Sequence, residues 1–449
     1  MKRKNAILAL LMSVVLIASV ATGCGKEIKN SVVETTPTTT EATTTTEATT
    51  TEATTTTAAT TTTAATTKAT TKATTKATVK ATTAKPATTA KPAATTAKPA
   101  AAAAVPTNTA GLGKYVYSNC LTAEEKTVYD EIVAAVSARK DSVTFAAPHN
   151  GELVTKIFRD VFFQESTLFW MNANTITWSG SINSIPLSYW VSAADQANMQ
   201  KNLDGAIARI NSKIPANSSV TTKLKVIHDD IAVKTVFAWS TDAANITSPS
   251  TAYGPLVDGK GQCEGYAKAV SYACTKLGIE SVRITGTNKE GKTHAWNKVL
   301  IDGKWYNVDT TWDDPENHTE PLYYKNNYLL VPDSQINGIT HFPVTTFTPP
   351  AATSLDANYF VKYGCYATTA DQAVTMMQAQ MTAAAKGKVP LAQVKCSTKA
   401  VYDAAVNAVL GKAIAMQDVT NKTAGANKIT GLSTTNDAST LVIQLNLTF

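Results

Sequence analysis

The chain has 449 residues, of which 44% are hydrophobic and 17% are charged, and its formal net charge is +7. Of the 41 basic and 34 acidic residues, 12 and 5 lie in residues 1–105, which leaves 29 of each for the rest of the chain. The part that can fold is therefore electrically neutral. It lacks the basic surface on which nucleic-acid binding depends, so we expect no nucleic-acid partner.

The first 23 residues have the pattern of an export signal. Residues 2–4 are Lys-Arg-Lys, residues 6–21 are mainly apolar, and Cys24 follows Thr22-Gly23. The apolar run is shorter than the roughly 20 residues that a transmembrane helix needs. The pattern predicts a signal peptide over residues 1–23 that resembles a bacterial lipobox, with cleavage before Cys24 and lipidation of its thiol. The protein would then be lipid-anchored at the cell surface, on the outer face of the cytoplasmic membrane. Plain secretion is the alternative.

Residues 24–106 are dominated by Thr and Ala, with lysines at intervals and three Lys-Pro pairs towards the end. Hardly any large apolar side chain is present, so no core could offset the entropy lost on ordering. We therefore expect a disordered stalk, stiffened by proline near its end.

Residues 107–215 alternate helix-like and strand-like segments and predict an N-terminal α+β domain. The helix-like segments have apolar residues at helical spacing, and the first begins with a capping box from Thr122 to Glu125. The predicted helices cover residues 121–140, 151–163 and 193–214, and the predicted strands cover residues 166–178 and 185–191. We find no catalytic motif here and expect this domain to pack against the next one.

The strongest chemical signal lies in the next predicted domain, residues 216–345, around Cys263. After a helix predicted over residues 219–237, turn-rich sequence leads to Cys263, and an apolar-periodic run then extends to about Leu277. Cys263 would thus lie at the start of a helix, where unpaired backbone N–H groups and the helix dipole favour a thiolate over a thiol. The thiolate is the nucleophilic form of cysteine.

A predicted hairpin brings a histidine and an aspartate together. Residues 298–301 and 305–308 are strand-like and flank Asp302-Gly303, which is the strongest short signal for a two-residue hairpin turn. In that register Asp309 lies one diagonal step from His294 on the same face of the sheet, a separation that side chains can bridge. The hairpin therefore presents an imidazole and a carboxylate on one side, against which the helix of Cys263 has to pack.

These three residues have the chemistry of a Cys-His-Asp triad, in which a cysteine attacks a carbonyl, a histidine moves the proton and an aspartate orients the imidazole. The segments that contain them resemble the transglutaminase-like superfamily, and in particular its secreted bacterial members. The resemblance is carried by four segments in order, residues 250–254, 259–267, 294–297 and 302–315. It implies that Cys263, His294 and Asp309 are a catalytic triad on a papain-like fold.

The resemblance also implies an oxyanion donor close to the cysteine. Tyr253 matches a family position where a ring donor often acts together with a backbone N–H at the cysteine, and core packing is the alternative interpretation of this residue. Gln262 is a second candidate, by comparison with the oxyanion glutamine of papain-like enzymes. Glu264 follows the nucleophile directly, and a carboxylate there should oppose thiolate formation.

The other cysteines predict neither a metal site nor a cofactor. No two cysteines have the Cys-x-x-Cys spacing typical of zinc sites, so we expect no bound metal and no cofactor. Cys274 has the position of a small buried apolar residue. Cys365 and Cys396 end two predicted strands and could form a disulfide in an exported protein, which the sequence alone does not decide.

Residues 350–449 predict a small C-terminal α/β domain with the order β-α-β-α-β. The predicted strands cover residues 359–367, 389–396 and 439–449, and the predicted helices cover residues 370–385 and 398–410. No catalytic motif occurs in this part of the chain.

The predicted fold is thus α+β, a papain-like core whose cysteine-bearing helix packs on an antiparallel sheet, with an N-terminal α/β region and the small C-terminal domain. We expect a cell-surface enzyme that transfers acyl groups from peptide or glutamine-type amides of a protein or peptide substrate, such as a cell-wall peptide. Water as the acceptor would give a protease or deamidase, which we favour slightly, and an amine would give a cross-linker. The alternative is a non-catalytic surface adhesion or cell-wall-binding module that retains the fold.

Overall fold

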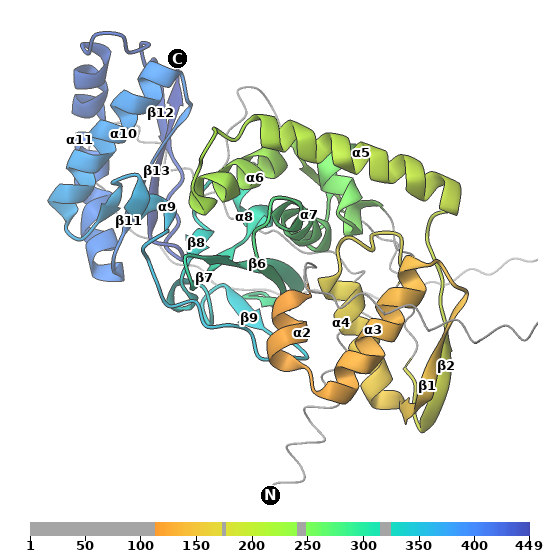
Figure 1. Ribbon diagram of the computed structural model, residues 1–449. Helices are drawn as coiled ribbons and strands as arrows, with labels where there is room; N and C mark the ends of the chain where they lie inside the picture. The colour runs from red at the N-terminus through yellow and green to blue at the C-terminus, as the bar shows by residue number, and fades with distance from the viewer. Residues whose placement is uncertain (1–112, 173–176, 240–247, 315–324) are drawn as a thin grey trace, which may run out of the picture. The chain divides into compact units, whose positions relative to one another are not determined.

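The computed structural model describes residues 113–172, 177–239, 248–314 and 325–449 (Figure 1). The predicted signal peptide, Cys24 and the stalk lie outside these residues, so they remain predictions. Within the described ranges, no helix is both long and apolar enough to cross a membrane. Two large hydrophobic cores are present, one formed between Val116 and Ala357 and the other between Phe360 and Leu447.

The N-terminal region consists of helices and one antiparallel ribbon. Its elements are α2 (Lys114–Cys120), α3 (Ala123–Ser137), β1 (Ser142–Asn150), α4 (Gly151–Gln164), β2 (Ser181–Pro186) and α5 (Ala193–Ser212). Helix α3 begins with the predicted capping box, in which Thr122 Oγ1 accepts the Glu125 N–H at 3.2 Å and the Glu125 carboxylate accepts the Thr122 N–H at 2.8 Å. The three helices predicted here agree with α3, α4 and α5 to within a few residues.

The strands of this region differ from the prediction. The expected strand over residues 166–178 is wrong for its described part, which is mostly turn and contributes one bridge, between Met171 and Tyr189. Phe169 and Trp170 are buried there, so their aromatic side chains fill the core without a sheet ladder. The second strand, β2, lies earlier than predicted and pairs with the unpredicted β1, with Val143 opposite Ile185.

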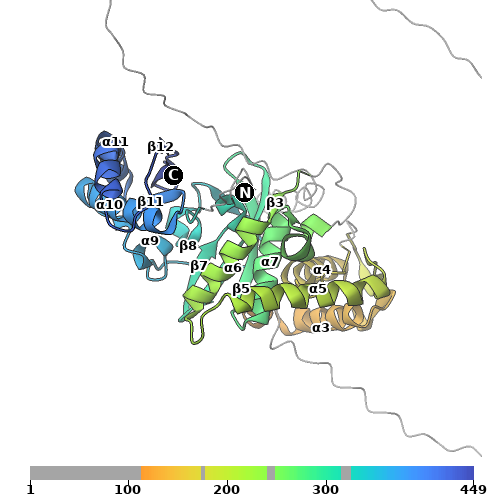
Figure 2. The same ribbon diagram turned by 90° about the horizontal axis from the view of Figure 1, so that it is seen from above.

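Helix α7 (Cys263–Lys276) lies at the centre of the first core. Every residue from Cys263 to Cys274 is buried, and α6 (Val220–Lys234) runs beside it (Figure 2). The chain passes from α6 to α7 through short elements, namely β3 (Val236–Phe237), η1 (Ser248–Ser250), η2 (Gly254–Asp258) and β4 (Lys260–Gly261). Strand β4 pairs in parallel with β3, which fixes the backbone directly before Cys263.

A five-stranded sheet forms the other half of this core, with the order β8-β7-β6-β5-β9 and antiparallel pairing throughout. The strands are β5 (Ser281–Asn288), β6 (Thr293–Ile301), β7 (Lys304–Val308), β8 (Leu329–Val331) and β9 (His341–Pro343); short helices α8 (Thr310–Asp313) and η3 (Asp333–Gln335) connect them. The hairpin of β6 and β7 has the predicted register, with Ile301 opposite Lys304. Asp302 and Gly303 have φ values of 49° and 76°, as a type I′ turn requires. Helix α7 on this antiparallel sheet confirms the predicted α+β core.

The N-terminal region and the cysteine-bearing region share a single hydrophobic core. The side chain of Gln164, the last residue of α4, pairs with the backbone of Arg283 in β5. Its Nε2 donates to the Arg283 carbonyl at 2.9 Å, and its Oε1 accepts the Arg283 N–H at 3.1 Å. Helix α4 is therefore fastened to the strand next to the one that carries His294.

The C-terminal region has a sheet of its own, with the order β10-β11-β13-β12. Its elements are α9 (Tyr359–Lys362), β10 (Tyr366–Ala367), α10 (Ala370–Gly387), β11 (Leu391–Cys396), α11 (Lys399–Asn421), β12 (Gly431–Thr434) and β13 (Val442–Thr448). The expected strand over residues 359–367 is wrong at its start, where the Asn358 side chain accepts the Phe360 N–H and caps α9. Cys365 and Cys396 are buried free thiols, so no disulfide joins them.

Candidate active site

Cys263 is the first residue of α7, as the sequence predicted, and its side chain is buried. The preceding residue, Gln262, is the N-cap, and its side chain makes no capping hydrogen bond. The N-cap side chain therefore does not neutralise the first N–H groups of α7 or the positive end of its dipole. Both act at the end of the helix that carries the sulfur. The Gln262 N–H donates to the carbonyl of Pro249 at 2.8 Å, which holds the cysteine in place from the N-terminal side.

Among the described cysteines, Cys120, Cys274, Cys365 and Cys396 are free thiols. A nucleophilic role of Cys263 requires its sulfur as a free thiolate, because only that form attacks a carbonyl.

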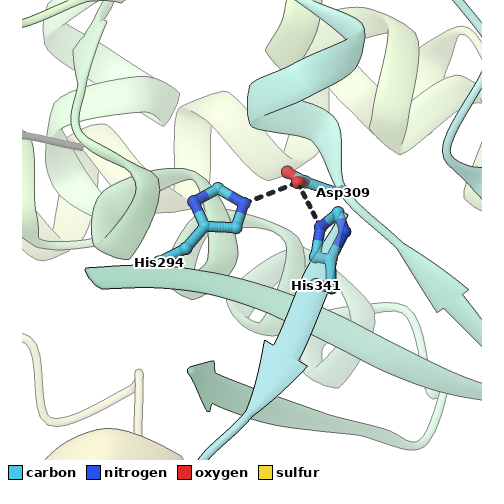
Figure 3. Close-up of side chains that lie close together, drawn as sticks. All are labelled: His294, Asp309 and His341. Atoms are coloured by element: carbon cyan, nitrogen blue, oxygen red, sulfur yellow. Dashed lines mark hydrogen bonds and ion pairs between the residues drawn. The ribbon is translucent and has the colours of Figure 1, made fainter. Parts of the chain in front are cut away.

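His294 and Asp309 are joined by a short hydrogen bond. His294 Nε2 lies 2.6 Å from Asp309 Oδ2, and both side chains are buried (Figure 3). Asp309 lies just beyond β7, so the aspartate reaches the histidine from the end of the hairpin, on the face that the register predicted. Because Nε2 is used by the carboxylate, Nδ1 is the ring nitrogen that can exchange a proton with a thiol.

Asp309 also begins a short helix. Its Oδ1 accepts the N–H groups of Thr311 at 3.0 Å and Trp312 at 3.3 Å, at the N-terminus of α8. Burial opposes ionisation, but the interactions with His294 and the hydrogen bond from His341 outweigh it and hold the pKa of Asp309 well below its usual range. The carboxylate is therefore ionised and fixed in orientation.

The structure places Cys263 against the strand that carries His294. Cys263, Ala267 and Ala295 form a small buried cluster of their own. Asn297 in β6 fastens the strand to the helix, since its Nδ2 donates to the Ala267 carbonyl at 3.0 Å and to Ser271 Oγ at 2.7 Å. These contacts pack the start of α7 against β6, the strand that carries His294.

Comparison with known proteins agrees with this arrangement. Residues 209–310 match the model of the transglutaminase-like superfamily. The chain contains a transglutaminase-like domain. Kyphoscoliosis peptidase of Mus musculus is 26% identical over 164 residues, which is 31% of this chain and 23% of that protein. The Homo sapiens protein of the same name is 26% identical over 133 residues, 25% of this chain and 20% of the relative.

The chain therefore spans less than a quarter of the length of these curated relatives. Among solved structures, a TGase is 22% identical and covers 27% of this chain and 34% of its own, with a TM-score of 0.24. The assignment of the domain depends on the sequence match and on the helix-on-sheet core described above.

His341 lies beyond the matched residues 209–310 and is a residue of this core that sequence reasoning missed. Its Nε2 lies 2.9 Å from the same Asp309 oxygen that His294 contacts, and its side chain is fully buried (Figure 3). It lies in β9, an edge strand of three residues that pairs with β5. No motif surrounds His341 in the sequence, and only the pairing of β9 with β5 reveals its position.

Glu264 does not act on Cys263 as an isolated carboxylate, contrary to the sequence-based expectation. It forms an ion pair with Arg283 of β5, and Lys268 Nζ lies 3.3 Å from its other oxygen. Burial lowers the pKa of Lys268 to about 7 and that of Arg283 to about 9, so Arg283 is the counter-charge that persists above neutral pH. The nearby cation offsets the carboxylate, and the helix dipole remains the main influence on the sulfur.

The two oxyanion candidates lie on either side of this arrangement. The Tyr253 hydroxyl accepts a hydrogen bond from Asn202 Nδ2 at 2.9 Å, and its ring stacks on Phe169 at 6.5 Å. Both contacts belong to the N-terminal region, so packing accounts for the position of Tyr253. Gln262 is 9% exposed and adjoins Cys263 in the chain, while the N–H of Cys263 is the first of α7.

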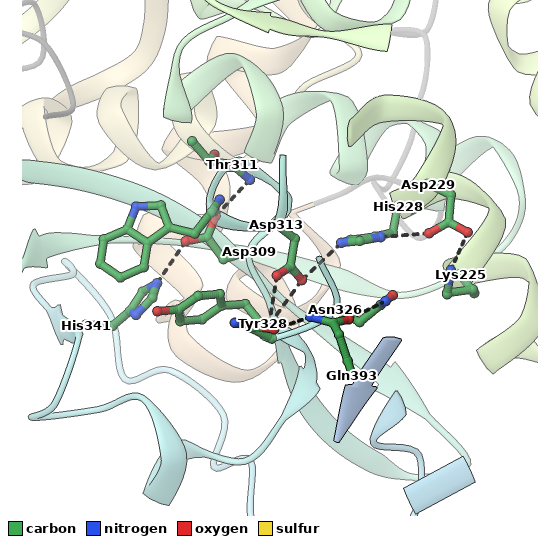
Figure 4. A network of polar contacts seen from close by, with 12 residues as sticks. Lys225, His228, Asp229, Asp309, Thr311, Asp313, Asn326, Tyr328, His341 and Gln393 are labelled. Carbon is green, nitrogen blue, oxygen red and sulfur yellow. Dashed lines mark hydrogen bonds and ion pairs between the residues drawn. The ribbon is translucent and has the colours of Figure 1, made fainter. Parts of the chain in front are cut away.

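A second buried network supports the far end of α8. His228 of α6 is completely buried, with Nδ1 3.0 Å from Asp229 Oδ1 and Nε2 3.2 Å from Asp313 Oδ2 (Figure 4). Burial opposes its charged form, but hydrogen bonds to the two carboxylates outweigh this and raise the pKa of His228. Asp313 ends the helix that begins after Asp309, so the buried imidazole of His228 ties α8 to α6.

Among the residues that the structure describes, His294, Asp309 and His341 form a cluster that could be considered for a metal ion. Each offers one possible ligand atom, and these atoms all lie within 4.8 Å of one another. Two ligand atoms of a tetrahedral zinc ion lie about 3.3 Å apart. Both imidazole nitrogens are closer than this to Asp309 Oδ2, at 2.6 and 2.9 Å. These distances correspond to hydrogen bonds, and the three side chains are arranged as a proton-carrying network.

Proposed function

We propose that the transglutaminase-like domain is a cysteine acyl-transfer enzyme, with Cys263 as nucleophile, His294 as acid and base, and Asp309 as the residue that orients His294. The observation that carries the proposal is the 2.6 Å hydrogen bond between His294 Nε2 and Asp309 Oδ2, on a strand against which a helix beginning with Cys263 is packed.

In the proposed reaction, the Cys263 sulfur attacks the carbonyl carbon of a substrate amide. The N–H of Cys263, the first of α7, is the donor that we assign to the oxyanion that forms. His294 Nδ1 then gives its proton to the departing amine, which leaves a thioester on Cys263. Water or a second amine, deprotonated by the same nitrogen, attacks the thioester and restores the thiolate.

Hydrolysis of the thioester would make the protein a protease or deamidase, and attack by an amine would make it a cross-linker. Kyphoscoliosis peptidase is named as a peptidase, which agrees with our preference for hydrolysis. We further propose that the enzyme is exported and anchored through lipidated Cys24, so that it meets protein or cell-wall peptide substrates outside the cell. The N-terminal sequence pattern supports this location.

The first test follows alkylation of Cys263 by iodoacetamide against pH, in protein treated with a reductant. In the wild type, labelling should be fast well below the ordinary thiol pKa of about 8.5, because His294 and the helix dipole stabilise the thiolate. The His294→Ala variant should lose this fast labelling. The Cys274→Ala variant is the matched control, because it removes a buried free thiol of the same helix and should leave the profile unchanged.

An unshifted profile in both wild type and His294→Ala would reject the enzyme and favour a non-catalytic surface module that retains the fold. If the profile is shifted, amine incorporation and peptide cleavage can be measured in parallel, with Cys263→Ala as the blank. Product in one assay and not in the other identifies the acyl acceptor.

A further inference from the structure

The carboxylate of Asp309 serves two imidazoles. Its Oδ2 lies 2.6 Å from His294 Nε2 and 2.9 Å from His341 Nε2. The ring of His341 lies among aromatic side chains, with centroids 4.8 Å from Trp296 and 4.9 Å from Trp312. It is therefore held in a defined place beside the proposed site, without facing solvent.

The hydrogen bonds of His341 fix its tautomer. Asp309 is ionised and can only accept hydrogen bonds, so His341 Nε2 must carry the proton that lies between them. Its Nδ1 lies 2.9 Å from Thr340 Oγ1, and a hydroxyl can donate to that nitrogen. Burial lowers the pKa of His341. The residue is thus a neutral imidazole that donates to Asp309 and accepts from Thr340.

We propose that His341 is a positioning residue that shares the Asp309 carboxylate with His294 and thereby sets the pH at which the Cys263 thiolate forms. A second donor on Oδ2 withdraws part of the negative charge that would otherwise stabilise protonated His294. The thiolate and the imidazolium form as a pair, so weaker support of the imidazolium moves their formation to higher pH. This inference rests on the proposed function.

A purely mechanical role for His341 is already filled by other contacts. Asp309 is held through Oδ1 by two N–H groups of α8. The ring of His294 is held by Trp296 and Trp312, at centroid distances of 6.0 and 5.3 Å. What His341 adds to these contacts is a proton on Oδ2, which is an electrostatic contribution.

The titratable groups around the two imidazoles are few. Asp309 faces both of them, Cys263 lies on the helix packed against the strand of His294, and Tyr328 has its ring 5.5 Å from that of His341. Burial and the nearby Asp437, Asp309 and Asp313 carboxylates keep Tyr328 neutral by raising its pKa well above its usual range. Among these groups only Asp309 is charged before the pair forms.

The test compares two variants in the alkylation profile of reduced protein. His341→Phe keeps a ring among the aromatic neighbours and removes the donor, whereas His341→Gln keeps an N–H at a similar reach. In His341→Phe the acid limb of the alkylation profile should move to lower pH by about one unit. At a fixed pH on that limb, alkylation of Cys263 should then be about tenfold faster. In His341→Gln the limb should stay close to that of the wild type.

An unchanged acid limb of the alkylation profile in His341→Phe would overturn the inference. A shift of that limb towards the ordinary thiol pKa would also overturn it, because it would mean that His341 only holds the site together. A wild type without an activated thiol would instead reject the proposed function itself. Histidine-labelled ¹⁵N NMR of the wild type gives an independent check, since the chain has 5 histidines. His341 should show protonated Nε2 and unprotonated Nδ1, and the reverse tautomer would also overturn the inference.

Discussion

Gly265, in the first turn of α7, offers a sharp test of how Cys263 is positioned. A Cβ added there would lie 2.0 Å from the carbonyl oxygen of Pro249. Real Cβ contacts are essentially never shorter than 3.0 Å, so this backbone would have to retreat by about 1 Å. The same carbonyl accepts the Gln262 N–H, and its retreat would weaken the contact that holds the start of the helix.

The expected size of the effect follows from three contributions. Overpacking costs about 1–3 kcal/mol, and loss of the Gln262 hydrogen bond costs about 1 kcal/mol. Alanine in place of a helical glycine returns about 1 kcal/mol. We therefore expect Gly265→Ala to lower the free energy of unfolding by about 1–3 kcal/mol and to slow alkylation of Cys263, because the start of the helix that carries the sulfur is displaced.

Gly205→Ala is the matched control, because this glycine also lies inside a helix, α5, and its added Cβ would meet nothing within 4 Å. It should stabilise the protein by about 0.5–1 kcal/mol. All 7 tryptophans lie between residues 170 and 312, so urea unfolding followed by tryptophan fluorescence reports this core and not the C-terminal one. Equal stabilities of the two variants, or unchanged labelling in Gly265→Ala, would refute this account of the helix start.

Two further predictions concern pH and buried charge. Because the folded-state pKa of His228 is raised, the stability that its charge provides is fully present below about pH 6.5 and is lost as pH rises through the higher folded value. The stability difference between wild type and His228→Gln in urea should therefore shrink from pH 6 towards pH 9, and a constant difference would disprove the charged form. Glu264→Gln should lower the free energy of unfolding by about 3–5 kcal/mol, because Arg283 stays buried without a counter-charge. The control Glu290→Gln, at an exposed position, should change it by less than about 0.5 kcal/mol. Similar losses in the two variants would exclude the buried ion pair.

The sequence predicted those parts of the site that local signals encode. The two-residue turn at Asp302-Gly303 fixes the pairing of β6 and β7, and strand alternation then places His294 and Asp309 on one face. Cys263 at a helix start follows from turn residues before it and apolar periodicity after it. Each of these signals extends over a few residues, so no knowledge of distant contacts was needed.

The parts that sequence reasoning missed depend on distant contacts. His341 reaches Asp309 only because its short strand pairs with β5 at the edge of the sheet, and no spacing encodes that pairing. The ion pair of Glu264 with Arg283 likewise joins α7 to β5. Phe169 and Trp170 suggested a strand because aromatic residues favour sheets. In the structure they lie in a turn, and their side chains fill the core without a sheet ladder.

The turn between β6 and β7 also limits how this sequence can diverge. Both of its residues have left-handed φ values, so the loop has no slack to absorb an extra residue. A single insertion in β7 would carry Asp309 about 3.3 Å along the strand and turn its side chain to the opposite face of the sheet. If one residue were added to each strand beside the turn, the two new residues would face each other and every other cross-strand pair would stay in register. We therefore expect homologous hairpins to differ in length only by an even number of residues, whereas surface loops can differ by any number.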